Sequence, residues 1–184
     1  MTQPADDETT FRRYVAYHEA GHALFAMLYA DVLRVRRATC VPKPGLYEGG
    51  CLLAHPTGDP RKWTRRQLIG FVRSLLAGCQ AAWVESGVTR QAPEDLERAY
   101  QIAIRVHDDE DAAVLWLENE RKAVEATFRQ PEVWRVLEAI AEALLREGML
   151  GGRKLRRIAE GSFESTRTGH NHGQTKSLAS RTPR

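Results

Sequence analysis

The sequence has little cysteine, and it lacks the patterns that mark secreted or membrane-spanning chains. Its three cysteines form no C-x-x-C pair and follow no secretory signal, because the N-terminus MTQPADDETT is polar and acidic. The longest apolar stretch, residues 20–33, contains His22 and Asp31 and is shorter than the ~20 residues that span a bilayer. These absences predict a cytoplasmic chain without a membrane span. In a reducing cytoplasm all three cysteines are expected to be thiols, and a Cys40–Cys51 disulfide is the less favoured alternative.

Excess positive charge is also absent from most of the chain. The formal net charge is +3, but residues 165–184 carry four basic side chains and no acid, which leaves residues 1–164 close to neutral. A nucleic-acid-binding face on the folded part is therefore not expected. The polar composition of residues 165–184 predicts a disordered basic tail, and residues 1–8 are also expected to be disordered. The domain proper is then residues 9–164.

Apolar periodicity predicts a mainly α-helical domain. Thr9 or Thr10 can cap a first helix that runs to about Ala30. Residues 32–55 combine short apolar runs with proline and glycine, which predicts two strands joined by a turn-rich loop. Further helices are expected at about residues 65–85, 93–106, 108–128, 132–147 and 153–160. The predicted fold class is a helical domain with a small two- or three-stranded β-sheet.

The first predicted helix contains the sequence His18-Glu19-Ala20-Gly21-His22, an H-E-x-x-H pattern. Residues four apart lie one turn apart on the same face, so both imidazoles can bind one zinc ion. Glu19 lies about 100° around the helix from His18 and can act as a general base towards a zinc-activated water. An apolar stripe on the same face predicts that both histidines face the core. The alternative is two buried histidines that pair with neighbouring polar groups.

A catalytic zinc site needs a third protein ligand. No histidine follows His22 at the spacing of the metzincins, since residues 32–45 contain none. His55, Asp95, His107 and several glutamates are candidates, and their positions in the sequence do not decide among them.

Four segments resemble the FtsH family of ATP-dependent zinc metalloproteases. AYHEAGHALF, residues 16–25, is similar to the zinc motif of that family. Residues 75–81 resemble its small-residue helix motif, residues 94–99 its aspartate motif and residues 143–150 its last helix pair. The resemblance covers roughly residues 10–160 and implies that the third zinc ligand is Asp95. The alternative role of Asp95 is to complement the dipole of a helix N-terminus.

The chain also departs from the family pattern. It has no G-x-x-x-x-G-K-[ST] nucleotide motif, and it has Ala82-Trp83 where the family usually places glutamates. The resemblance therefore implies a stand-alone, ATP-independent zinc endopeptidase that cleaves unfolded or flexible polypeptides, with a separate unfoldase or adaptor as a partner. An exposed strand within residues 32–53 could bind the substrate as an added strand, or it could belong to an ordinary hairpin. Whether the chain forms a homo-oligomer is left open.

Two other functions stay open. A zinc-stabilised interaction module could keep this fold without proteolysis, and a helical scaffold could form without any metal.

Overall fold

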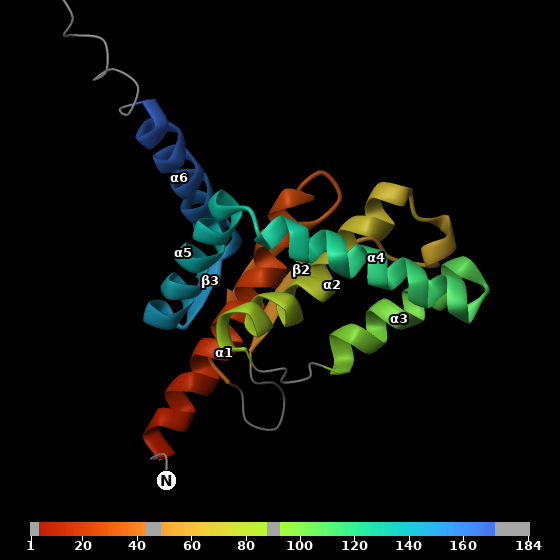
Figure 1. Cartoon of the computed structure of the whole chain (residues 1–184), viewed down its shortest axis with the longest axis horizontal. Helices are drawn as coiled ribbons and strands as arrows, with labels where there is room; N and C mark the ends of the chain where they lie inside the picture. The colour runs from red at the N-terminus through yellow and green to blue at the C-terminus, as the bar shows by residue number, and fades with distance from the viewer. Residues whose placement is uncertain (1–3, 43–48, 88–92, 172–184) are drawn as a thin grey trace, which may run out of the picture.

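The computed structural model describes residues 4–42, 49–87 and 93–171. Within these residues six α-helices pack together with one small sheet (Figure 1), which confirms the predicted fold class. The helices are α1 (Pro4–Leu28), α2 (Arg65–Ser86), α3 (Pro93–His107), α4 (Glu110–Phe128), α5 (Pro131–Glu147) and α6 (Gly152–Asn171). The strands are β1 (Arg34–Thr39), β2 (Gly50–Ala54) and β3 (Met149–Gly151), and a short 3-10 helix, η1, spans Pro60–Lys62.

Helix α1 is the central helix of the fold. It packs against α2, α5 and the sheet, and every residue from Val15 to Ala26 is buried. The apolar stripe predicted from the sequence is thus part of a helix that is covered on all sides. Helix α1 begins at Pro4 and so includes part of the segment 1–8 that the sequence predicts to be disordered. Proline suits the first position of a helix, where its missing N–H needs no partner.

Helix α2 begins as the sequence predicts and then lies very close to α1. Thr64 and Gln67 form a capping box, in which the backbone N–H of Gln67 donates to Thr64 Oγ1 (3.2 Å) and that of Thr64 to Gln67 Oε1 (2.9 Å). At the crossing with α1, a Cβ added to Gly21 would lie 2.4 Å from the carbonyl oxygen of Ala77. The glycine in the middle of the H-E-x-x-H pattern therefore permits the two backbones to approach.

The sheet has the strand order β2-β1-β3, and both pairs are antiparallel. The central strand β1 packs on α1, with Val35 and Ala38 buried. Its register with β2 shifts between Val35 and Arg37. The third strand follows α5 directly, since Gly148 ends that helix at a φ of 76° and β3 begins at the next residue. None of the three cysteines is in a disulfide.

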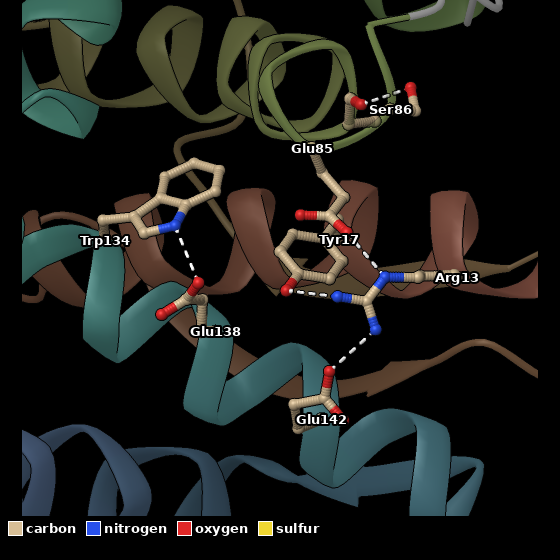
Figure 2. A network of polar contacts seen from close by, with 8 residues as sticks. Arg13, Tyr17, Glu85, Ser86, Trp134, Glu138 and Glu142 are labelled. Atoms are coloured by element: carbon tan, nitrogen blue, oxygen red, sulfur yellow. Dashed lines mark hydrogen bonds and ion pairs between the residues drawn. The ribbon is translucent and has the colours of Figure 1, made fainter.

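One polar network joins three helices (Figure 2). Arg13 on α1 donates to Glu85 on α2 (2.5 Å), to Glu142 on α5 (2.9 Å) and to the hydroxyl of Tyr17 (3.2 Å). Burial, together with the negative charge of Glu85, raises the pKa of Tyr17 to about 12. The Tyr17 ring lies 6.2 Å from that of Trp134 on α5. The network therefore ties α1 to both α2 and α5.

The C-terminal helix is longer than predicted. The sequence predicts a helix over residues 153–160 and disorder from Ser165, whereas α6 extends to Asn171. Extending a formed helix costs little compared with nucleating it, and Leu155 and Ala159 anchor α6 in the core. Residues 172–184 of the predicted tail lie outside the described residues, so the boundaries of the domain stay a prediction. Among the described helices, none combines the length and hydropathy that a membrane span requires.

Candidate metal centre

Side chains from α1 and α3 meet at one point beside α2. The Nε2 atoms of His18 and His22 lie 2.9 Å apart. Oδ2 of Asp95, in the first turn of α3, lies 3.2 Å from Nε2 of His18 and 3.1 Å from Nε2 of His22. The structure thus brings together the three residues expected to bind zinc, although Asp95 is far from the histidines in sequence.

A backbone group orients one of the two imidazoles. Nδ1 of His22 lies 2.6 Å from the carbonyl oxygen of Ser74 on α2, and a carbonyl can only accept, so Nδ1–H donates. The lone pair of a neutral His22 is then on Nε2, which faces His18 and Asp95. A hydrogen bond of this kind is what sets the tautomer of metal-binding histidines.

Glycine is required where α2 passes the two rings. A Cβ added to Gly78 would lie 2.4 Å from Nε2 of His22 and 2.9 Å from Cε1 of His18. The small residues of segment 75–81 therefore let the backbone of α2 form one wall of the site. The sequence shows that these residues are small, but their contact with the histidines depends on the packing of α1 against α2.

The three converging groups strongly perturb one another. Burial lowers the pKa of His18, and the charge of His22 lowers it further. Burial also disfavours the charged form of His22, but the hydrogen bond and the charge of Asp95 outweigh it and raise the pKa of His22 to about 9. For Asp95, burial acts against ionisation, yet the hydrogen bonds with His18 and His22 hold its pKa well below the usual range.

These atoms fit a metal ion. Two imidazole nitrogens and a carboxylate oxygen are all electron-pair donors, so only a proton or a metal cation between them makes their approach favourable. Two histidines and one carboxylate are a known set of protein ligands for catalytic zinc. The donor set therefore agrees with the zinc site expected from the sequence.

Glu19 lies beside this cluster in an unusual environment. Its side chain is buried, and Oε2 has no hydrogen-bond partner in the part of the chain that the structure describes. Burial raises the pKa of Glu19 to about 7. A Cβ added to Gly49, just before β2, would lie 2.9 Å from Oε1 of Glu19. Burying a carboxyl group without a partner is costly, which favours a functional role over a structural one.

The other two histidine candidates make contacts elsewhere. The ring of His55 stacks on Phe71 with a centroid distance of 4.3 Å, and its Nε2 accepts a hydrogen bond from Arg98 (3.1 Å). His107, at the end of α3, packs against Trp116 at 5.2 Å. Neither belongs to the group of potential metal ligands found among the described residues.

The group of potential metal ligands contains a residue that the sequence alone does not identify. Potential ligand atoms of His18, Asp95 and Cys79 all lie within 4.8 Å of one another. Cys79 follows Gly78 on α2, and its place beside the site could have been suspected only from the small-residue segment to which it belongs.

The chain is similar to known metalloproteases. A model for peptidase family M41 matches residues 7–107. The sequence is 39% identical over 93 residues, half of this chain, to "ATP-dependent zinc metalloprotease FtsH" of Syntrophobacter fumaroxidans. It is 28% identical over 191 aligned residues, which cover 83% of this chain, to the protein of the same name from Thermotoga maritima. The matches span only 14% and 31% of the lengths of these two relatives.

Proposed function

The chain belongs to peptidase family M41, and we propose that it is a zinc-dependent endopeptidase whose metal is held by His18, His22 and Asp95. The observation that carries the proposal is the convergence of their three ligand atoms, separated by 2.9 to 3.2 Å. A bound zinc ion supplies a Lewis acid for the substrate carbonyl and lowers the pKa of a bound water.

The chain's own residues have distinct roles in this proposal. Ser74 keeps the ring of His22 in the orientation that binds the metal. Asp95 brings the negative charge that a site with two neutral histidines lacks, and it ties α3 to α1. Glu19 takes the proton of the attacking water and later delivers it to the leaving amine. Its buried carboxyl, with a pKa of about 7, is suited to both steps near neutral pH.

We further propose that the substrate is an extended segment of polypeptide. β2 is an edge strand of the described sheet, with β1 as its one neighbour there, and an edge strand can pair with a peptide. The residue before β2, Gly49, lies against Glu19, so a strand added there would pass close to the site. Such a site accepts unfolded or flexible segments, and a folded substrate would need a separate unfoldase or adaptor. A cytoplasmic location stays a prediction from the cysteine usage.

The test combines metal analysis with a cleavage assay. The purified protein should contain about one zinc per chain and cleave casein or members of a peptide library. Glu19→Gln should retain the metal and lose cleavage by a factor of about 10² to 10⁴. Glu94→Gln, a change of an exposed acid in the first turn of α3, is the matched control and should behave like the wild type. Equal cleavage by the Glu19→Gln protein would contradict the proposal.

One observation favours a second candidate, a zinc-stabilised interaction module without proteolysis. Trp83 and Val84, near the end of α2, are 46% and 44% exposed, and Trp83 stands at a position where the FtsH resemblance leads one to expect a glutamate. Exposed large apolar side chains are typical of protein-binding surfaces. Bound zinc without cleavage of any substrate would favour this module, and absence of zinc would favour a plain scaffold.

A further inference from the structure

We infer that Cys79 is a fourth protein ligand of the metal ion held by His18, His22 and Asp95, an inference that rests on the metal site proposed above. The first observation is geometric. The sulfur of Cys79, a ring nitrogen of His18 and a carboxylate oxygen of Asp95 lie within 4.8 Å of one another, and they come from three different helices.

Helix α2 places the thiol at the metal site. The helix already contacts the site twice, through the carbonyl of Ser74 on His22 and through the backbone of Gly78 against both imidazoles. Cys79 is the next residue and is half-buried. Because the backbone of α2 lies against both histidines, the thiol of Cys79 is held beside the same centre.

The site also has polar atoms that the protein does not satisfy. Nδ1 of His18 and Oε2 of Glu19 are buried and have no hydrogen-bond partner among the described residues. As a whole residue, Glu19 is 6% exposed. Buried polar groups are normally paired, so the unpaired carboxyl oxygen of Glu19 indicates that the site is completed by something other than the present side-chain contacts.

The distances suit coordination after a small adjustment. Zinc binds nitrogen at about 2.0–2.1 Å and thiolate sulfur at about 2.3 Å, so two ligands of a tetrahedral ion lie about 3.5 Å apart. The atoms of His18, Cys79 and Asp95, which lie within 4.8 Å of one another, therefore need to move inward by roughly 1 Å or less. Thiolate is also a ligand that zinc prefers.

A fourth protein ligand changes the state of the site. Catalytic zinc sites keep one position for water, whereas four protein ligands are typical of structural zinc. A site held by Cys79 as well as by His18, His22 and Asp95 would leave no position for water, so Glu19 could not act while the sulfur is bound. Cys79 thus makes the proposed peptidase latent until its thiolate dissociates.

Cobalt substitution tests the inference by a readout that does not depend on activity. The full-length protein is loaded with Co²⁺, and the near-ultraviolet charge-transfer band of a cobalt–thiolate bond is recorded together with the cobalt content. We expect this band in the wild-type protein and its loss in Cys79→Ser while cobalt is still bound. Cys51→Ser is the matched control, because Cys51 is also half-buried and near the site: burial, and then the charges of Glu19 and Asp95, raise its pKa. It should keep the band.

A second measurement uses the affinity for zinc, determined by competition with a chromogenic chelator. Cys79→Ser should weaken zinc binding by about tenfold or more, since even loss of an outer-shell partner costs 10- to 100-fold, and Cys51→Ser should not.

The outcomes separate the two proposals. Bound cobalt without a thiolate band, or a band that survives in Cys79→Ser, overturns the role of Cys79 and leaves the peptidase proposal intact. A wild-type protein that binds neither zinc nor cobalt overturns the metal site itself.

Discussion

The imidazole of His22 donates its Nδ1 proton to the carbonyl oxygen of Ser74 over 2.6 Å, and this bond links the candidate metal centre to the packing of α1 on α2. Ser74 is fully buried, and its hydroxyl donates to the carbonyl of Phe71 (2.7 Å). The orientation of a proposed metal ligand is thus set by the backbone of a neighbouring helix. Changes in how closely α1 and α2 pack should therefore alter metal binding.

Gly78→Ala should weaken metal binding more than it affects folding. The added Cβ would lie 2.4 Å from Nε2 of His22, so the ring must move away from His18 and Asp95. We expect zinc affinity to fall by about 10- to 100-fold or more, the range found when groups that orient ligands are lost. The measurement is chelator competition. Gly161→Ala on α6, where an added Cβ meets nothing within 4 Å, is the control, and equal affinities of the two variants would count against the role of Gly78.

Gly21→Ala should destabilise the fold. Its Cβ would lie 2.4 Å from the carbonyl oxygen of Ala77, a backbone atom that cannot rotate away, so α1 and α2 must separate. Overpacking of this kind costs about 1–3 kcal/mol, whereas Gly161→Ala should gain up to ~1 kcal/mol from helix propensity. Urea unfolding monitored by circular dichroism measures both. A Gly21→Ala protein as stable as the wild type would mean that the two helices do not cross this closely.

Arg13→Ala should lower stability modestly and leave metal binding unchanged. The guanidinium of Arg13 joins Glu85, Glu142 and Tyr17 (Figure 2), but its side chain is 42% exposed, so solvent screens the ion pairs. We expect a loss of about 1 kcal/mol in the free energy of unfolding. Zinc content serves as the control, because the network lies outside the group of metal ligands. A loss of zinc in this variant would show that the network and the metal site are coupled.

Removal of the metal should lower the thermal stability of the protein. A metal ion held by residues of both α1 and α3 would bind only the folded state. A ligand of this kind stabilises the folded state by about 4 kcal/mol at a thousandfold excess over Kd. Chelation should therefore reduce the melting temperature, and added zinc should restore it. His18→Ala should be insensitive to both treatments. A wild-type melting temperature that does not respond to chelation would contradict this prediction.

The sequence predicts the helices well because their signals are local. Apolar periodicity, the Thr64 capping box and the prolines at positions 93 and 131 each depend on neighbouring residues, and the structure has helices at these places. The sequence does not predict where the third strand lies, because Met149–Gly151 is too short to show an alternating pattern. It forms only because the end of α5 lies beside β1.

In the candidate metal centre, too, some residues can be predicted from the local sequence and others only from tertiary packing. His18, Glu19 and His22 are predictable because their spacing fits one turn of a helix. The prediction that Asp95 is the third ligand rests on the family resemblance. The residues alone leave several candidates for that ligand open, and only the packing of α3 decides among them. Apart from the small-residue segment to which they belong, Gly78 and Cys79 have no signal that connects them with histidines on another helix, so the structure is needed to place them at the site.

Metal affinity of Asp95→Ala tests the central claim most directly. Zinc binding by the wild type, Asp95→Ala and the neighbouring Glu94→Ala is measured by chelator competition and metal analysis. Our account predicts about one tightly bound zinc per chain in the wild type and in Glu94→Ala, and a loss of affinity of at least about 100-fold in Asp95→Ala. Undiminished zinc affinity in Asp95→Ala would contradict it.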